Sequence, residues 1–248
     1  EHPHEENRWS VVAGALIVQV ILGTVYAFSV FVKPLQTEFG WDRTTTQWAF
    51  SFALATFAIT MIPAGRLQDR IGPRRVATIG GILLGLSFLL GALIVDGSRP
   101  WALYLTYGIG GGAGIGCAYV CPLAASVKWF PDKKGLITGL AVAGFGAGAI
   151  FFAGPASSLL LPPGESGEAM GLSQILLGGL GIVKGQGFGI GWQAFFILHG
   201  IVCAGGVVLG AMLLRNPPPG WTPPGWTPPQ GAGRAALLFQ RRIYQRAY

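Results

Sequence analysis

Residues 65–75 read GRLQDRIGPRR and carry five charged side chains within eleven positions. On either side lies a run without Asp, Glu, Lys or Arg: Trp48–Gly65 has 18 residues and Val76–Val95 has 20. An apolar, uncharged run of about 18 or more residues is long enough to cross a bilayer as a helix. The sequence therefore predicts two membrane helices joined by a short basic connection.

Four further runs of the same kind extend this pattern to the whole chain. Of its 248 residues, 51% are hydrophobic and 11% are charged, whereas an ordinary soluble domain has about 25% charged residues. A soluble helical bundle would need charged outer faces, and a disordered chain would need few apolar residues. We therefore expect an all-α membrane protein with six transmembrane helices. The four further runs are Trp9–Val32, Trp101–Val127, Gly135–Leu161 and Ile190–Leu214.

The distribution of basic residues predicts the orientation of the helices. The second and fourth connections and the C-terminal tail hold 12 of the 17 Lys and Arg residues. Cytoplasmic loops of membrane proteins carry an excess of these residues, so we expect these segments and both termini in the cytoplasm. A nucleic-acid-binding protein would instead show a basic face on a folded soluble domain. The net charge of +7 therefore indicates topology, and no nucleic-acid partner is expected.

This interpretation divides the chain into three parts. Residues 1–8 form a cytoplasmic N-terminus, residues 9–215 the six-helix membrane part, and residues 216–248 a proline-rich cytoplasmic linker with a basic tail. The linker contains PPGWT twice; this favours an extended spacer, with a site for a proline-recognising partner as the alternative. Residues 162–189 are expected to form an interfacial or packed loop, because their apolar part is too short to span. The last 18 residues, Gly231–Tyr248, are expected on the anionic surface of the inner leaflet.

The first and fourth runs share a weak pattern. In each, a glycine is followed three residues later by a tyrosine and further on by a proline; the pairs are Gly23 with Tyr26 and Gly116 with Tyr119. Many transporter folds are built from internal repeats. The six helices are therefore expected to form two three-helix repeats. Pro34, which follows the first run, is expected to end its helix.

The basic connection has the pattern G-x-x-x-D-R-x-G-x-R-R. Its glycines permit a tight turn and close backbone approach, its aspartate can lie against the positive N-terminus of another helix, and its arginines can pair with carboxylates or lipid phosphates. A merely basic topology loop would explain the arginines but not the spacing of glycine and aspartate. The positions of the pattern are Gly65, Asp69, Arg70, Gly72, Arg74 and Arg75.

This pattern resembles the signature loop of the major facilitator superfamily, which helps to latch the cytoplasmic gate. A second stretch is narrower: Tyr119 and Pro122 precede WFPDKKGL at 129–136, and a glycine-rich segment follows. Together with Asn7-Arg8-Trp9, it looks like the oxalate/formate exchanger family of that superfamily.

The resemblance runs from about residue 7 to residue 229 and matches the first half of the family's twelve-helix fold. It implies a multi-pass protein of the bacterial inner membrane and, as a partner, a C-terminal six-helix half that is missing from this sequence. Because the sequence begins with Glu1, we expect a trimmed N-terminus or a fragment.

The resemblance also selects a candidate substrate site. It implies that Tyr26, Gln47 and Tyr119 face the site, and that cationic residues for a carboxylate lie in the missing half. Tyrosine and glutamine can donate hydrogen bonds to a carboxylate, and aromatic walls shape a dry pocket; packing between helices is the alternative role for each. Val25 stands where the family's oxalate exchangers carry Gln. A small monocarboxylate such as formate, lactate or pyruvate is therefore as well supported as a dicarboxylate.

Three other features have simpler interpretations. Residues 108–113, GIGGGA, loosely fit a dinucleotide-binding fingerprint, but that fingerprint needs a preceding strand, so helix packing is favoured. His199 lies within a run, where ionisable residues are often functional, but a hydrogen-bonded packing role is favoured. Cys117 and Cys121 are too few for a metal site of the usual four ligands, and no cofactor is expected.

The expected function is secondary active or exchange transport of a small carboxylate by alternating access. One alternative is a truncated membrane module that does not transport, and another is a major facilitator transporter with a different substrate. An enzyme is not expected, because the sequence shows no nucleophile–base set, metal cluster or carboxylate pair.

Overall fold

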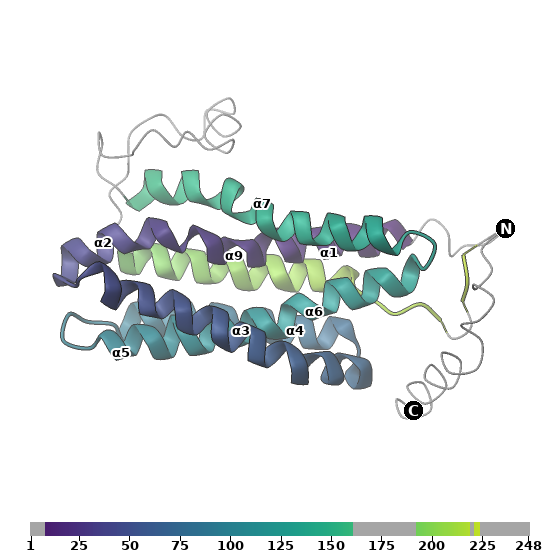
Figure 1. Ribbon diagram of the computed structural model, residues 1–248, viewed down its shortest axis with the longest axis horizontal. Coiled ribbons are helices and arrows are strands. Elements are labelled where there is room, and N and C mark those ends of the chain that lie inside the picture. The colour runs from purple at the N-terminus through teal and green to yellow at the C-terminus, as the bar shows by residue number, and fades with distance from the viewer. Residues whose placement is uncertain (1–7, 161–191, 219–220, 224–248) are drawn as a thin grey trace.

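The computed structural model describes residues 8–160, 192–218 and 221–223, and in these residues all regular structure is helical. Six helical segments are long and apolar enough to cross a membrane, and they run side by side along the long axis of the molecule (Figure 1). The six predicted spans and the all-α fold are therefore confirmed. The predictions for residues 162–189 and Gly231–Tyr248 fall outside the described residues.

The first span is a long helix with a change of geometry in its middle. It comprises α1 (Arg8–Leu22), the 3₁₀ segment η1 (Gly23–Phe28) and α2 (Ser29–Phe39). The expectation that Pro34 ends this helix is wrong, because Pro34 lies inside α2 and the helix ends at Gly40, with φ +66°. Membrane helices tolerate an internal proline where local 3₁₀ adjustments and neighbouring helices satisfy the freed backbone groups.

The second and third spans meet at one glycine. Helix α3 (Arg43–Ile71) starts at Asp42, whose side chain accepts a hydrogen bond of 3.0 Å from the Thr45 amide. It ends at Gly72, whose φ of +90° and ψ of 154° belong to a region that only glycine adopts readily. Helix α4 (Pro73–Ile94) begins at the next residue, with proline in its first turn. The second glycine of the signature loop is thus required by the turn.

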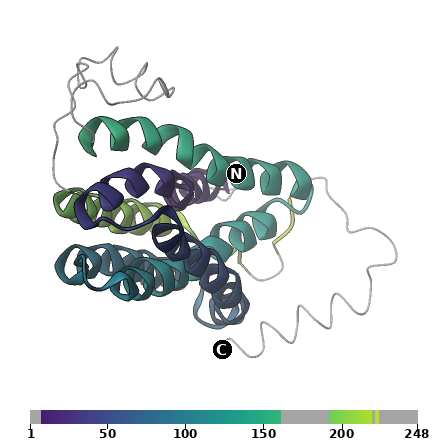
Figure 2. The same cartoon turned by 60° about the vertical axis from the view of Figure 1, so that its left-hand side comes forward.

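The fourth span also contains a segment that is not α-helical. It comprises α5 (Pro100–Leu103), the π-helical segment η2 (Tyr104–Gly111) and α6 (Gly112–Trp129). Helices α7 (Lys134–Leu160) and α9 (Trp192–Leu213) complete the six spans. Figures 1 and 2 show α7 along one side of the bundle, α1 and α9 in the middle, and α3 and α4 on the other side.

Glycines allow the fourth span to pack closely against two neighbours. A Cβ atom at Gly116 would lie 2.7 Å from the carbonyl oxygen of Phe57 on α3, and one at Gly114 would lie 2.6 Å from the backbone nitrogen of Leu84 on α4. Such approach is possible only without a side chain, as in small-residue membrane interfaces. The packing interpretation of this glycine-rich stretch is therefore confirmed. Gly108 and Gly112 also face α3, and Gly110 also faces α4.

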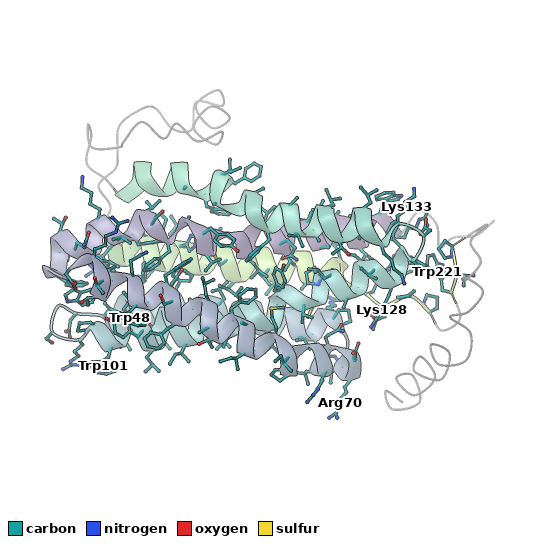
Figure 3. The ribbon with its side chains drawn as sticks, viewed as in Figure 1. Trp48, Arg70, Trp101, Lys128, Lys133 and Trp221 are labelled. Carbon is teal, nitrogen blue, oxygen red and sulfur yellow. The ribbon has the colours of Figure 1, made fainter. Side chains whose placement is uncertain are left out.

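Charged residues and tryptophans lie at the ends of the bundle. Figure 3 shows Arg70, Lys128, Lys133 and Trp221 at one end, which we call the basic end, and Trp48 and Trp101 at the other. The start of α1 also lies at the basic end, because the Trp9 ring is 4.9 Å from that of Phe130. The second and fourth connections therefore lie at the same end of the molecule, as the predicted topology requires.

Candidate functional site

Four aromatic side chains from four different spans meet in one cluster, which we call the aromatic cluster. It consists of Tyr26 on η1, Phe57 on α3, Tyr119 on α6 and Phe145 on α7. The ring centroid of Phe145 lies 5.1 Å from that of Tyr26 and 4.9 Å from that of Tyr119. The Phe57 ring lies 5.2 Å from that of Tyr119 and 6.1 Å from that of Phe145. The structure therefore brings together the two tyrosines that the repeat pattern had paired.

The glycine in each repeat explains how its tyrosine reaches the cluster. A Cβ atom at Gly23 would collide with the backbone of Phe145, so the glycine lets α7 approach η1. Gly116 does the same between α6 and α3, at the carbonyl of Phe57. In both repeats the tyrosine follows its glycine by three residues, almost one helical turn. It therefore contacts a phenylalanine of the helix that packs against the glycine: Phe145 for Tyr26 and Phe57 for Tyr119.

The aromatic cluster is open on one side. Tyr26 is 45% exposed, whereas Phe145, whose ring meets that of Tyr26 edge to face, is only 5% exposed. Within the described residues, neither the Tyr26 nor the Tyr119 hydroxyl makes a hydrogen bond. Phenol hydroxyls are donors as well as acceptors. The cluster thus offers two available donors on an aromatic surface.

The third predicted site residue, Gln47, lies apart from the two tyrosines. It is exposed in the first turns of α3. Phe57 follows it by ten residues on the same helix, a separation of about 15 Å at a rise of about 1.5 Å per residue. Val25, where the oxalate exchangers carry Gln, is only 4% exposed and packs in the core. The structure therefore brings together two of the three predicted site residues.

The signature loop makes a different contact from the one we expected. We expected Asp69 against the N-terminus of another helix, but it lies in the last turn of α3 and forms an ion pair of 3.2 Å with Lys128 on α6. Its carboxylate also accepts a hydrogen bond of 2.8 Å from the side chain of Gln68. Lys128 was not predicted as a functional residue, although it directly precedes the WFPDKKGL stretch.

The other positions of the loop divide into structural and exposed residues. Gly72 is needed for its backbone conformation, whereas a Cβ atom at Gly65 would make only an ordinary contact of 3.8 Å with Val120. The close approach expected at Gly65 is therefore not required in this structure. The arginines of the loop are exposed and make no ion pair with any described residue. They are Arg66, Arg70, Arg74 and Arg75.

An open groove of about 490 Å³ lies along the second half of α6, toward the basic end. The groove has apolar walls, and at one end lies the ion pair between Asp69 and Lys128. None of the four residues of the aromatic cluster lines the groove. The groove is lined by Gln68, Asp69, Val120, Leu123, Ala124, Val127, Lys128 and Thr138.

The remaining candidates have packing roles. His199 is only 6% exposed and lies among phenylalanine rings, the nearest being Phe88 at 4.8 Å between centroids. Its Nε2 atom has no hydrogen-bond partner among the described residues, so the packing role is confirmed but not the expected hydrogen bond. Within the described chain, no group of three or more potential metal ligands occurs, and Cys117 and Cys121 remain free thiols.

Phe57 and Phe145 could not have been identified from their own sequence neighbourhoods. Each is one of many apolar residues in an uncharged run, and its contact with a tyrosine depends on which helices are neighbours. The only sequence signal was indirect: a glycine three residues before each tyrosine, which marked a close helix contact without naming the partner.

Comparison with known proteins identifies the family of the chain. The Major Facilitator Superfamily profile matches residues 15–243. The chain is 32% identical over 217 residues to the uncharacterized MFS-type transporter YhjX of Escherichia coli (strain K12), covering 87% of this chain and 46% of the relative. It is 33% identical over 180 residues to the oxalate:formate antiporter of Oxalobacter formigenes, covering 69% and 42%.

A third relative is monocarboxylate transporter 3 of Rattus norvegicus, 31% identical over 220 residues, with 87% of this chain and 38% of the relative covered. The chain thus spans less than half the length of these three relatives. The match covers nearly all of the membrane-spanning residues, and the signature loop lies within it. This six-helix chain belongs to the Major Facilitator Superfamily.

Proposed function

We propose that the chain is the N-terminal half of a transporter that moves a small carboxylate by alternating access. The observation that carries the proposal is the open aromatic cluster, in which the hydroxyls of Tyr26 and Tyr119 are available as donors beside Phe145. A carboxylate needs donors, and an aromatic wall excludes competing water. The relatives that the chain matches include proteins named as an oxalate:formate antiporter and as monocarboxylate transporters, which favours this substrate class.

The chain's own residues suggest how this half contributes. The described membrane spans carry their charged residues near the helix ends, so the counter-charge for the anion is proposed to come from a C-terminal half. Tyr26 and Tyr119 are proposed to orient the carboxylate, and Gln47, about 15 Å away along α3, is proposed to donate to it at a separate point on its path. Val25 supplies no donor where the family's oxalate exchangers carry Gln, so a small monocarboxylate is as well supported as oxalate.

The proposed orientation places the basic end in the cytoplasm. Arg70, Lys128 and Lys133 lie at this end together with the start of the linker (Figure 3), and an excess of basic residues marks cytoplasmic loops. Residues 216–248 are then a cytoplasmic linker and tail. In this orientation the signature loop and its ion pair between Asp69 and Lys128 lie at the cytoplasmic gate.

The test is exchange in proteoliposomes that contain the complete gene product, loaded with unlabelled carboxylate. Uptake of labelled formate, lactate, pyruvate or oxalate is measured, with a neutral sugar as the control solute. We expect saturable uptake of at least one small carboxylate that exceeds uptake of the sugar. If the reconstituted protein moves none of the four carboxylates, the proposed substrate class is wrong.

A further inference from the structure

The residues that follow α9 pack against the end of α6. We call residues 214–218 and 221–223 the linker strap. The indole Nε1 of Trp129 donates a hydrogen bond of 2.8 Å to the carbonyl oxygen of Arg215. The ring of Trp221 lies 4.9 Å from that of Trp129, nearly edge to face. One tryptophan of α6 therefore holds the strap at two points.

The strap is also shaped by its own contacts. The Trp221 amide donates a hydrogen bond of 3.1 Å to the carbonyl oxygen of Pro218. Leu214 is 1% exposed, and Pro217 and Pro223 are buried as well. Proline loses little conformational freedom when it is ordered, because its ring already restricts the backbone. A segment of this composition can therefore dock with few contacts.

Lys128 connects the docked strap with the signature loop. Its ammonium group lies 3.2 Å from Oδ1 of Asp69 in the loop and 3.4 Å from Oδ1 of Asn216 in the strap. An ammonium group has three donors and can serve both oxygens at once. Lys128 and Asp69 are both partly exposed, at 32% and 38%, and exposed ion pairs contribute little to stability. This contact can therefore break and re-form at small cost, as a moving gate requires.

We propose that Lys128 is a positioning residue that couples the linker strap to the signature loop, so that docking of the strap and the position of Asp69 depend on each other. The proposal rests on the proposed function for its role at the gate, but the contacts themselves do not. Release of the strap leaves Lys128 with Asp69 alone, and loss of Asp69 leaves Lys128 with the strap alone. A change in the position of the loop would then change how the strap is docked, and with it the start of the part of the protein that follows the strap.

Spin labels test this coupling without reference to transport. All native cysteines, including Cys117, Cys121 and Cys203 of this chain, are replaced by alanine, and one label is placed at the exposed Thr222 through Thr222→Cys. Electron paramagnetic resonance then measures how mobile the label is in the complete gene product in nanodiscs. We expect an immobilised component that is lost in Trp221→Ala and in Lys128→Ala.

The sequence supplies a matched control in the second copy of PPGWT. Trp226 holds the same place in that copy as Trp221 does in the first. Trp226→Ala should retain the immobilised component at position 222. If all these variants give the wild-type spectrum, or if Trp226→Ala has the same effect as Trp221→Ala, the docked strap is not held as inferred and the proposal fails.

A second label tests whether Lys128 carries the coupling. It is placed in the signature loop through Arg70→Cys, at an exposed position. Asn216→Ala should change the mobility of this label when Lys128 is present and should have no further effect in Lys128→Ala. If Asn216→Ala acts equally in both backgrounds, or in neither, the coupling is refuted. A wild-type protein that moves no carboxylate would refute the proposed function and leave these spectra interpretable.

Discussion

The rings of Tyr26 and Tyr119 pack against the same side chain, that of Phe145, at centroid distances of 5.1 and 4.9 Å. The two tyrosines lie 93 positions apart in the sequence, one in each three-helix repeat, and a third helix supplies the ring between them. Both repeats thus deliver a phenol hydroxyl to one open surface. The predictions below test that surface, the packing that creates it, and the two ends of the bundle.

Removal of the Tyr119 hydroxyl should weaken carboxylate binding. A hydrogen bond to a charged group contributes about 1.5–3 kcal/mol, so Tyr119→Phe should raise the dissociation constant by about tenfold to a hundredfold. Competition binding to the complete gene product measures this. The control is Tyr104→Phe, whose hydroxyl donates to the carbonyl of Thr45 at 2.8 Å and should affect stability rather than affinity. Equal losses of affinity in both variants would mean that the effect arises from packing.

A methyl group at Gly116 should separate two helices. The new Cβ atom would lie 2.7 Å from the carbonyl oxygen of Phe57, and such overpacking typically costs about 1–3 kcal/mol. Gly116→Ala should therefore lower the melting temperature in detergent. Gly146→Ala is the matched control, because nothing lies within 4 Å of a Cβ atom there and alanine favours a helix. A similar decrease in both variants would contradict the close contact between α6 and α3.

Neutralising Asp69 should impair transport more than stability. Its ion pair with Lys128 is partly exposed, and such pairs contribute about 0–1 kcal/mol. Asp69→Asn should therefore leave the melting temperature nearly unchanged while it slows exchange in proteoliposomes. Glu38→Gln changes an exposed carboxylate at the other end of the bundle and serves as the control for loss of charge. Wild-type exchange rates in Asp69→Asn would refute a role for this residue in the gate.

Stability should fall in acid partly because of Asp42, which lies outside the spans. The side-chain hydroxyl and the amide of Thr45 donate to this carboxylate and lower its pKa from the ordinary value of 3.8. Because the pKa of Asp42 is lower in the folded state, its ionised carboxylate stabilises the fold at pH values above 3.8. This stabilisation is lost as the pH falls through the lowered pKa. Asn is an equally good cap but does not titrate.

Melting temperatures of the wild type and of Asp42→Asn should therefore be similar at neutral pH and should diverge as the pH falls through this range, with the wild type becoming the less stable protein. The pKa of Asp96 is also lowered, first by the hydroxyl of Ser98, and it titrates in both proteins. Only the difference between the two melting curves reports on Asp42. A difference that does not change with pH would contradict the predicted capping role of the ionised carboxylate.

Cysteine labelling should place the two ends of the bundle on opposite sides of the membrane. Membrane-impermeant reagents should reach single cysteines at Gly40 and Gly97 from outside, and those at Arg70 and Lys133 only from the cytoplasm. Arg70 and Lys133 lie together at the basic end (Figure 3). Gly97 lies near Gly40, because its carbonyl accepts a hydrogen bond of 2.9 Å from the ring of Trp41. Labelling of positions 70 and 97 from the same side would contradict the six-span topology.

The sequence by itself determined the number of spans and the ends at which the basic residues lie. Both follow from local composition, because a bilayer excludes charge from any helix that crosses it, whatever that helix packs against. It also determined the turn at Gly72, since the backbone conformation there excludes a side chain. The glycines before Tyr26 and Tyr119 indicated close helix contacts for the same local reason.

Only the tertiary structure decided which helices those glycines admit, and therefore that Tyr26 and Tyr119 share Phe145. It also decided that Pro34 continues a helix, that Gln47 lies apart from both tyrosines, and that Asp69 pairs with Lys128. The physical reason is that apolar runs are interchangeable in composition. Close packing in the folded protein decides which helices are neighbours, and so which side chains touch. The contact between Asp69 and Lys128, which are 59 positions apart, depends on this packing.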